Sequence, residues 1–487
     1  MMLLRLATLS VVLATGCSGG EAISADVESR PGGIDPTKVQ AAAKKLDDKI
    51  TELGGTDSIA FVAVGSGDVL GAAHEHDPKN PASNAKLPTT VAALTILGPA
   101  HRFVTGLYGD VESGVVSELV LRGRGDPTLS SDDLSGMVRE LRAFGVTKVG
   151  KVLVDQGFFD DQYVPPAFDQ QPNEWAYFRA PVAAVSLNEN TVTLWLHPTK
   201  DGKPAEIRVN PPGFLEVSGA IDTVKKGLDE DISCDMSVIS GDRLKATVAG
   251  KLPEGDRLVP IVKRIEDPRR FPGFALKAIL KEQGIKVGDG VELGGRKEKR
   301  ALVVHASRPL GEIVTLLGKD SDNFVAEMLL RATGEGKGGT TNTSDGISAI
   351  SACLDQRGGL DAGTKITNGS GLFDADRYTA FGLAKLLASA YKDPAIAPEF
   401  VAQLSIGGVD GTLRSRFKGW ADRRAIRGKT GTLNAAIALS GYILAPGNDP
   451  PVAFSLLAND IAGKGKQVRE AMDQAVEDVA AEVWAGH

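Results

Sequence analysis

The two ends of the chain carry matching patterns, and this likeness constrains the fold more than any other feature of the sequence. Near the N-terminus, apolar residues recur at helical spacing over residues 37–53, and two short strand-like runs follow around a Gly-Ser-Gly turn. Near the C-terminus, apolar strands at 435–444 and 451–460 flank a turn-rich segment and precede an amphipathic helix over 466–484. Because these hairpins can share a sheet, we expect one α/β domain built from both ends of the chain.

A block of different character lies between the two ends. Residues 104–300 contain short β-type runs such as "SELVLRG", "NTVTLWLHP" and "LKATVAG", which are punctuated by Gly, Pro and Asp. The chain has 487 residues, well above the usual size of about 100–150 residues for one domain. We therefore expect a discontinuous domain formed by residues 37–103 and 301–487, interrupted by a β-rich insertion of one or two lobes at 104–300.

The first residues are typical of an export signal. The apolar stretch Leu6–Ala14 follows one cation and is too short to span a bilayer of about 30 Å as a helix. Small residues then precede Cys17, a pattern similar to the bacterial lipobox, in which this cysteine is acylated and becomes the new N-terminus. We expect a signal peptide at 1–16, a lipid anchor at Cys17, a flexible tether at 17–36 and a place on the periplasmic side of a bacterial membrane. Ordinary cleavage with a free Cys17 is the alternative.

Composition excludes several classes of function. The 55 basic and 62 acidic residues give a net charge of only −7, so no strong positive field favours a nucleic acid partner. With three cysteines and six histidines, a zinc ribbon or a densely disulfide-linked fold is not expected, and neither a metal nor another cofactor is. The sequence His74-Glu75-His76-Asp77 lacks the HExxH spacing and is interpreted as a solvated cluster. Cys234 and Cys353 are expected to be unpaired thiols, with a disulfide as the alternative.

Three short strings carry the candidate chemistry: Ser83-Asn84-Ala85-Lys86, Ser321-Asp322-Asn323 and Lys429-Thr430-Gly431. The first begins at or near the start of a predicted helix, where residues three apart share a face, so the lysine amine can approach the serine hydroxyl. A serine hydroxyl is a weak nucleophile until a base takes its proton, and lysine is such a base only when burial or nearby cations favour its neutral form.

The other two strings supply neighbours for this pair. Ser321 offers a hydroxyl that donates and accepts, and Asn323 offers an amide. Lys429 can bind a carboxylate or help to keep Lys86 neutral. The Lys429-Thr430-Gly431 string precedes an apolar strand, so we expect it near a strand start, with Gly431 allowing close approach of a substrate backbone. Together these residue types favour acyl transfer on a substrate with a carboxylate.

The three strings in this order are the signature of penicillin-binding proteins and class A β-lactamases. The chain resembles one branch, the class C low-molecular-mass penicillin-binding proteins, which form the D-alanyl-D-alanine carboxypeptidase/endopeptidase family. The long gap between Ser83 and Ser321 agrees, because this family fills it with extra domains. The resemblance spans nearly the whole mature chain and is carried by "PASNAKLPTTVAALTILGPAHRF" (81–103), "GRGDPTLSSDDL" (123–134), "APVAAVSLNEN" (180–190), "KDSDNFVAEMLL" (319–330), "NGSGLFDADR" (368–377), "GGVDGTLRSRF" (407–417) and "RGKTGTL" (427–433).

The resemblance implies a fold and a role for the first two strings. The fold is α/β (α+β), a penicillin-binding transpeptidase-like domain with an antiparallel sheet flanked by helices. Ser83 would attack the penultimate D-alanine carbonyl, with Lys86 as general base. Ser321 would relay a proton to the departing D-alanine nitrogen, and Asn323 would hold the substrate backbone.

The resemblance also implies the substrate contacts. Lys429 and Thr430 would receive the terminal carboxylate next to Gly431, and the backbone N–H groups of the nucleophile and Thr432 would form the oxyanion hole. Asp155, in the β-rich block, is a candidate for binding a cationic group of the stem peptide, with an ordinary strand-end acid as the alternative. The chain departs from the family at Asn368-Gly369-Ser370-Gly371, where an Asp commonly stands first.

We therefore predict a serine-type D-alanyl-D-alanine carboxypeptidase, with DD-endopeptidase action as well, that hydrolyses peptidoglycan stem peptides through an acyl-enzyme on Ser83. β-Lactam antibiotics would acylate the same serine as substrate mimics. Two alternatives remain open at this point: a β-lactamase-like serine hydrolase, and a catalytically silent lipoprotein that binds peptidoglycan.

Overall fold

The computed structural model of the protein describes residues 33–239, 242–255, 257–295, 300–334 and 340–485. The expected signal peptide, the lipidation site at Cys17 and most of the expected tether lie outside these residues. Within the described ranges, no helix offers an apolar stretch long enough to span a membrane.

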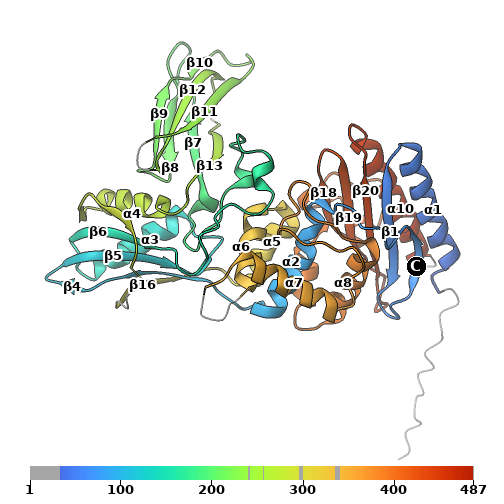
Figure 1. Cartoon of the computed structure of the whole chain (residues 1–487). Helices are drawn as coiled ribbons and strands as arrows, with labels where there is room; N and C mark the ends of the chain where they lie inside the picture. Colours follow the sequence, from blue (N-terminus) through green and yellow to red (C-terminus); the bar gives the residue numbers. More distant parts are fainter. Residues whose placement is uncertain (1–32, 240–241, 256, 296–299, 335–339, 486–487) are drawn as a thin grey trace, which may run out of the picture.

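A six-stranded antiparallel sheet joins the two ends of the chain in the order β17-β18-β19-β20-β1-β2 (Figure 1). The first strand pairs along its whole length with the last one, so that Phe61 lies opposite Phe454. This pairing confirms the prediction that strands from both ends share a sheet. The bounds are β1 Thr56–Ala63, β2 Val69–Ala73, β17 Ser405–Ile406, β18 Ile426–Thr432, β19 Ala436–Ile443 and β20 Val452–Asn459.

Helices cover both faces of this sheet. On one face lie α1 (Pro36–Glu52) and α10 (Gly465–Val483). The Asp35 carboxylate caps α1 by accepting a hydrogen bond from the Thr37 N–H, and Pro36 occupies the first turn, where it loses no intrahelical bond. On the other face α8 packs directly against the strands, and one apolar core joins it to the remaining helices of this side. The bounds are α2 Lys86–Leu97, α5 Leu310–Thr315, α6 Asn323–Thr333, α7 Thr343–Gln356, α8 Ala380–Lys392 and α9 Ala397–Gln403.

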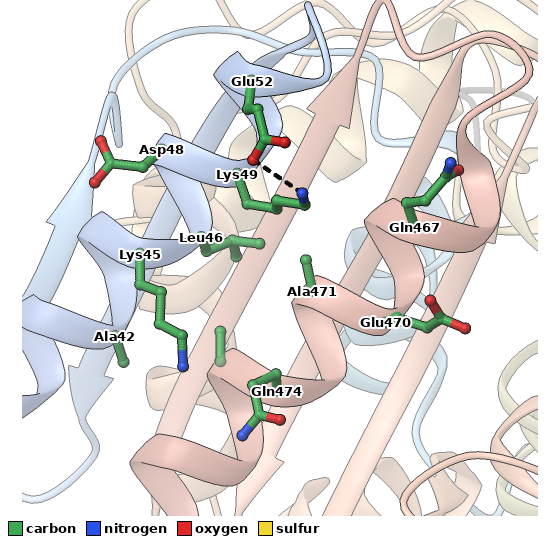
Figure 2. Close-up of a pocket in the computed structure, with 11 residues that line it drawn as sticks. Ala42, Lys45, Leu46, Asp48, Lys49, Glu52, Gln467, Glu470, Ala471 and Gln474 are labelled. Atoms are coloured by element: carbon green, nitrogen blue, oxygen red, sulfur yellow. Dashed lines mark hydrogen bonds and ion pairs between the residues drawn. The ribbon is translucent and has the colours of Figure 1, made fainter.

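The outer helices leave a shallow groove of about 550 Å³ between them (Figure 2). Its floor contains Leu46 and Ala471, and its rim carries charged side chains such as Lys49, which forms an ion pair with Glu52 at 2.9 Å. The groove lies on the face of the sheet opposite to α2 and is therefore separate from Ser83.

The first part of the insertion is a seven-stranded mixed sheet ordered β14-β6-β5-β3-β16, with β4 and β15 beside it. Helices α3 and α4 pack on it around one apolar core. Strand β16 begins at the boundary expected at residue 301 but pairs with β3, so residues 301–306 belong to this sheet. The bounds are β3 Val104–Tyr108, β4 Val111–Glu112, β5 Val115–Gly123, α3 Ser131–Ala143, β6 Lys148–Asp155, α4 Phe271–Glu282, β14 Lys286–Val287, β15 Val291–Leu293 and β16 Ala301–Ala306.

A smaller β lobe is inserted into this part in turn and projects from it (Figure 1). It consists of a four-stranded and a three-stranded sheet, which bury a separate apolar core that includes Leu194 and Val248. Cys234 lies half-buried on β11 and Cys353 is buried on α7; both are free thiols, as predicted. The bounds are β7 Thr191–His197, β8 Glu206–Asn210, β9 Leu215–Gly219, β10 Asp222–Val224, β11 Asp231–Val238, β12 Leu244–Pro253 and β13 Val259–Arg264.

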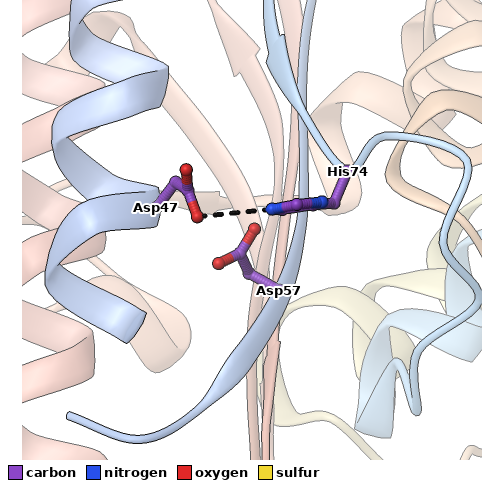
Figure 3. A group of neighbouring side chains, drawn as sticks. All are labelled: Asp47, Asp57 and His74. Atoms are coloured by element: carbon purple, nitrogen blue, oxygen red, sulfur yellow. Dashed lines mark ion pairs between the residues drawn. The ribbon is translucent and has the colours of Figure 1, made fainter. Parts of the chain in front are cut away.

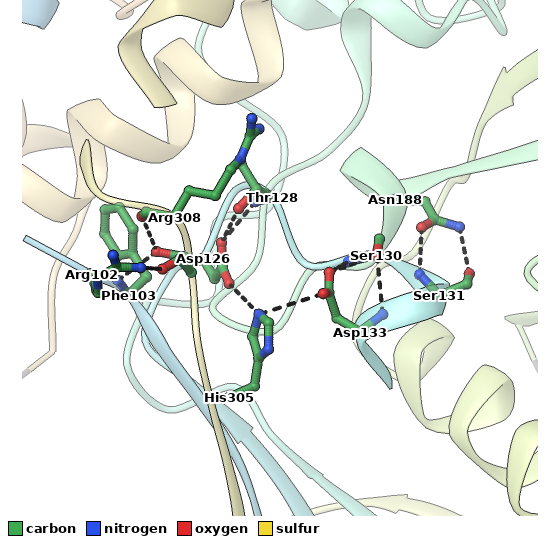
Figure 4. Close-up of polar contacts among 11 residues, drawn as sticks. Arg102, Phe103, Asp126, Thr128, Ser130, Ser131, Asp133, Asn188, His305 and Arg308 are labelled. Carbon is green, nitrogen blue, oxygen red and sulfur yellow. Dashed lines mark hydrogen bonds and ion pairs between the residues drawn. The ribbon is translucent and has the colours of Figure 1, made fainter. Parts of the chain in front are cut away.

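The chain enters and leaves the insertion at one place, where polar contacts tie the two crossings together (Figure 4). Arg102 donates to the Ser307 carbonyl oxygen at 2.6 Å, and the Phe103 N–H donates to Ser307 Oγ at 2.9 Å. His305 lies 3.9 Å from a carboxylate oxygen of Asp126 and 4.0 Å from one of Asp133. The His305 ring therefore lies where the insertion joins the other domain, beside two carboxylates of the insertion.

Candidate active site

Ser83 lies on a 3₁₀ turn, Ala82–Ala85, that leads directly into α2. The regular helix therefore begins at Lys86, just after the predicted start. Ala82 adopts a left-handed φ of 47°, and its N–H donates to the Asn80 side-chain oxygen at 2.9 Å. The backbone geometry of this turn therefore positions Ser83, which precedes the first residue of the regular helix.

Lys86 is fully buried, and its ammonium nitrogen contacts oxygen atoms from three segments. Nζ lies 2.9 Å from Ser83 Oγ, 2.6 Å from Asn323 Oδ1 and 2.8 Å from the Ser370 carbonyl oxygen. The first two of the three sequence strings therefore meet at this one nitrogen. Its approach to the serine hydroxyl is the one that the three-residue spacing predicts.

Ser321 and Asn323 lie where a π-helical turn, Leu316–Asp320, changes into α6. Ser321 takes a left-handed φ of 61° there, a conformation that an L-residue other than glycine seldom adopts outside functional or turn positions. Asp322 caps α6 by accepting a hydrogen bond from the Val325 N–H at 2.9 Å. This kink separates Ser321 from the helix and lets Asn323 face Lys86.

Lys429 is also fully buried and approaches the site from the sheet. Its Nζ donates to Ser321 Oγ at 2.8 Å and to the Thr430 carbonyl oxygen at 2.7 Å. The string Lys429-Thr430-Gly431 lies in the interior of β18 and not near the start of the strand that follows it, which corrects the expected placement. The reason is that this polar run is itself paired with β19.

Thr430 and Thr432 are two residues apart and therefore lie on the same face of this strand. Thr432 lines the pocket beside Ser83, and Thr430 Oγ1 donates to Thr412 Oγ1 at 2.8 Å. A Cβ on Gly431 would lie 2.7 Å from the Pro81 carbonyl oxygen. This glycine thus allows the strand to approach the protein's own nucleophile turn, whereas the sequence predicts that it admits a substrate backbone.

Burial controls the protonation of both lysines. Burial lowers the pKa of Lys86 to about 7, although nearby carboxylates, including Asp322 and Glu327, oppose the shift. Burial also holds the pKa of Lys429 well below its usual range, and the charge of Lys86 adds to this effect. Desolvation is therefore the main reason that Lys86 can be neutral, ahead of the neighbouring cation invoked from the sequence.

Glu327 is a site residue that the motifs do not reveal. This buried carboxylate accepts hydrogen bonds from the N–H groups of Gly369 at 3.1 Å and Ser370 at 2.9 Å, and so fixes the carbonyl that Lys86 contacts. Burial raises its pKa. Asn323 and Glu327 are four residues apart on α6 and face the same side, which is the signal that could have identified it.

The pocket next to Ser83 has a volume of about 680 Å³ and is bounded by both domains. The insertion supplies one wall through a loop between β6 and β7, in which the Phe178 carbonyl oxygen accepts a hydrogen bond from Asn323 Nδ2 at 2.9 Å. The lining residues include Asn80, Ser83, Gln170, Phe178, Ser321, Asn323, Phe373, Asp374, Arg377, Thr432 and Asn434.

Asp155 does not line this pocket. It is buried at the end of β6, where one carboxylate oxygen lies 2.7 Å from Arg122 Nε and the other accepts from the Gly157 N–H at 3.0 Å. It lines a separate, smaller pocket together with Phe158 and Thr340. The structure therefore brings together Ser83, Lys86, Ser321, Asn323 and Lys429 but leaves Asp155 apart from them.

The sequence matches a known protein family over most of its length. A model of the D-Ala-D-Ala carboxypeptidase 3 (S13) family matches residues 40–479. The chain belongs to this family. The resemblance inferred from the three strings is thereby confirmed, and so is the assignment of the chain as a serine carboxypeptidase of the hydrolase class.

Two relatives of this S13 protein match it over most of their own length. A D-alanyl-D-alanine carboxypeptidase from an Actinomadura species is 30% identical over 438 residues, covering 86% of this chain and 80% of that one. Penicillin binding protein 4 from Haemophilus influenzae superposes with a TM-score of 0.73 at 20% identity, covering 92% of this chain and 99% of that chain.

A predatory peptidoglycan endopeptidase from Bdellovibrio bacteriovorus superposes with a TM-score of 0.51 at 16% identity, covering 87% of this chain and 92% of that chain. At such identities the two solved structures show a common fold. They confirm the predicted mixed α/β, penicillin-binding architecture of the S13 protein.

Proposed function

We propose that this S13 protein hydrolyses the D-alanyl-D-alanine end of peptidoglycan stem peptides through an acyl-enzyme on Ser83. The observation that carries the proposal is the 2.9 Å contact between Ser83 Oγ and the buried Lys86 amine, whose pKa is lowered to about 7. At neutral pH a substantial fraction of this amine is free of its proton and can act as a base.

Acylation begins when Ser83 Oγ attacks the penultimate carbonyl and its proton passes to Lys86. The N–H groups of Ser83 and Thr432 stabilise the oxyanion; removing one such donor in other enzymes costs about 2.7–4 kcal/mol. The C–N bond then breaks, and the leaving D-alanine nitrogen takes the proton that Lys86 accepted, with Ser321 as the relay. In the second step Lys86 takes a proton from the water that attacks the acyl-enzyme. The ester bond to Ser83 Oγ then breaks, this oxygen regains the proton, and the shortened peptide is released.

The contact between Lys429 and Ser321 supports the role of Ser321 as a relay. Lys429 is buried behind this hydroxyl, so it acts on the pocket through Ser321 and not by direct contact. Thr430 and Thr432 lie two residues apart on the exposed face of β18, where their hydroxyls are suited to bind the terminal carboxylate of the substrate.

Endopeptidase action requires room for a second peptide strand beside the scissile bond. The pocket is bounded by two domains, and its lining includes Asn323, Asp374 and Arg377. A relative in fold is named as a peptidoglycan endopeptidase. We therefore include cleavage of cross-linked peptides in the proposed activity.

The test is covalent labelling by a fluorescent penicillin together with D-alanine release from a pentapeptide ending in D-alanyl-D-alanine. Wild-type protein should label with one penicillin per chain and release D-alanine, and Ser83→Ala should do neither. Ser83→Ala must keep the wild-type melting temperature for this comparison. A folded wild-type protein that never labels would contradict the proposal.

The same assays separate the two alternatives. Rapid turnover of the penicillin without D-alanine release would indicate a β-lactamase-like hydrolase. Binding of peptidoglycan without labelling or hydrolysis would indicate a silent binding protein. The meeting of Ser83, Lys86 and Asn323 at hydrogen-bond distances favours a catalytic protein over a silent one. The match to the S13 family favours a carboxypeptidase over a β-lactamase.

We further propose that the protein is exported to the periplasmic side of the cell envelope and held there by a lipid on Cys17. The apolar leader and the small residues before Cys17 support this assignment. Detergent-phase partitioning of wild type and Cys17→Ser tests it. The wild type should partition into detergent and the variant into the aqueous phase; aqueous partitioning of both would contradict a lipid anchor.

A further inference from the structure

Three potential metal ligands meet on the outer side of the central sheet, away from Ser83. Asp47 comes from α1, Asp57 from β1 and His74 from the residue that follows β2 (Figure 3). One ligand atom from each side chain lies within 4.8 Å of the other two. No spacing motif marks this cluster in the sequence, because its members come from three separate elements.

Asp57 is the member that calls for an additional partner. The residue is only 3% exposed, and its Oδ1 has no hydrogen-bond partner among the described residues. Figure 3 shows its carboxylate directed into the space between Asp47 and His74. A buried carboxylate oxygen without a partner is costly, and a second carboxylate facing it adds repulsion.

The spacing of the cluster suits two ligands of one ion better than a hydrogen bond. His74 Nε2 and Asp47 Oδ1 are 3.5 Å apart, beyond the usual hydrogen-bond range of about 2.7–3.2 Å. Ligand atoms placed about 2.0–2.2 Å from a tetrahedral zinc ion are separated by about 3.4 Å. The observed separation therefore needs little adjustment for both atoms to bind the same ion.

We propose that Asp47, Asp57 and His74 bind one divalent transition-metal ion, with Zn²⁺ as the preferred occupant and water completing its coordination. An imidazole nitrogen with carboxylate oxygens favours Zn²⁺ over Mg²⁺ or Ca²⁺, which prefer oxygen ligands alone. The imidazole side is open to solvent, since the His74 side chain is 56% exposed, and this leaves room for water.

The ion has a structural role in this position. It links α1 to the β1–β2 hairpin, and the chain runs from His74 through only a short segment to Ser83. None of the three ligands lines the pocket beside Ser83. Binding should therefore stabilise the folded protein and leave penicillin acylation unchanged.

The test uses protein purified without a histidine tag and dialysed against Zn²⁺, with bound metal measured by mass spectrometry. We expect one zinc per wild-type chain and at least a tenfold loss of affinity in Asp57→Asn and His74→Gln. His76→Gln is the matched control, because His76 is equally exposed at 56% and pairs with Asp361 outside the cluster. It should bind zinc as the wild type does.

Two further measurements keep the result interpretable. Zn²⁺ should raise the melting temperature of the wild type by a few degrees and that of His74→Gln by much less, whereas Mg²⁺ should change neither. Co²⁺ should give the intense visible absorption of a tetrahedral site in the wild type only. Zinc that binds equally to wild type and both ligand variants, or not at all, would overturn the proposal. Penicillin labelling of each variant verifies its fold independently.

Discussion

Asn323 Oδ1 accepts a hydrogen bond from Lys86 Nζ at 2.6 Å, although the two residues lie on opposite sides of the whole insertion in the sequence. This contact joins the start of α2 to the start of α6. It also places an uncharged acceptor, in preference to a carboxylate, next to the buried amine. This hydrogen bond orients the lysine side chain. Because the amide carries no negative charge, it favours the protonated form of Lys86 less than a carboxylate at the same place would.

The pH dependence of acylation follows from this environment. Burial lowers the pKa of Lys86 to about 7, so the base is protonated and inactive below that pH. We expect the acylation rate constant to rise about tenfold per pH unit below pH 6 and to level off above pH 8. Rates measured with a fluorescent penicillin between pH 5 and 9 check this. A midpoint near 10, the ordinary value for lysine, would exclude Lys86 as the buried base.

Glu327 should tune this base through its charge. The Glu327 carboxylate raises the pKa of Lys86 while it holds the Ser370 segment by backbone hydrogen bonds. Glu327→Gln keeps the shape but removes the charge, so the midpoint of the acylation profile should move to lower pH by about one unit or less. Glu327→Ala should instead lower the rate at every pH, because it also leaves these N–H groups unpaired. Identical midpoints in wild type and Glu327→Gln would contradict the electrostatic role.

Gly431 should tolerate no side chain. A Cβ there would lie 2.7 Å from the Pro81 carbonyl oxygen and 3.0 Å from Ala82 Cβ, so the nucleophile turn must shift. We expect Gly431→Ala to lower the acylation rate about 100-fold, the effect of a misplacement of about 1 Å. Gly419→Ala, where a Cβ meets nothing within 4 Å, is the control and should keep the full rate. Equal rates in the two variants would show that the strand can move freely.

Asp376 should make stability depend on pH. Burial raises its pKa to about 7, whereas the unfolded chain has an ordinary aspartate near 4. The folded state therefore binds the extra proton, and the stability that this proton provides is full below about pH 4 and is lost as pH rises to about 7. Asp376→Asn should flatten this part of the profile and raise the melting temperature relative to wild type at pH 8. Parallel melting curves between pH 4 and 8 would contradict the shift.

Asp155 should have little influence on substrate choice. Both carboxylate oxygens are engaged, by Arg122 and by the Gly157 N–H, and the side chain does not line the pocket of Ser83. We expect Asp155→Asn to change the KM for a stem peptide with a free side-chain amine less than twofold. A large increase in KM for that peptide, absent for its acetylated form, would instead support a direct contact.

Features with a strong local or periodic signal were predictable from the sequence. The apolar runs at the two ends indicate strands that share a sheet, and β1 does pair with β20. The spacing of Ser83 and Lys86 predicts their contact because three residues make nearly one helical turn. The β-type runs in the insertion likewise lie in β5, β7 and β12.

Features that depend on tertiary packing were not predictable. The Lys429 string has no apolar alternation, so its place inside β18 follows only from its pairing with β19. The left-handed Ser321 depends on a π-helical turn that no composition rule indicates. The spacing from Asn323 could place Glu327 on the side of α6 that faces the site, but its hydrogen bonds to Gly369 and Ser370 join segments that are distant in sequence and follow only from the fold.

The pairing of β1 with β20 also determines which part of the chain can fold first. The last strand of the insertion is β16. The two apolar cores of the insertion contain no described residue beyond this strand, so the insertion can fold before the rest of the chain is available. The central sheet has to wait for β20, which is made close to the end of the chain. Lys429, on β18, is also among the last parts of the chain to be made. An unfinished chain therefore cannot complete the site around Ser83, and the hydrolase stays inactive until its last strand has been delivered.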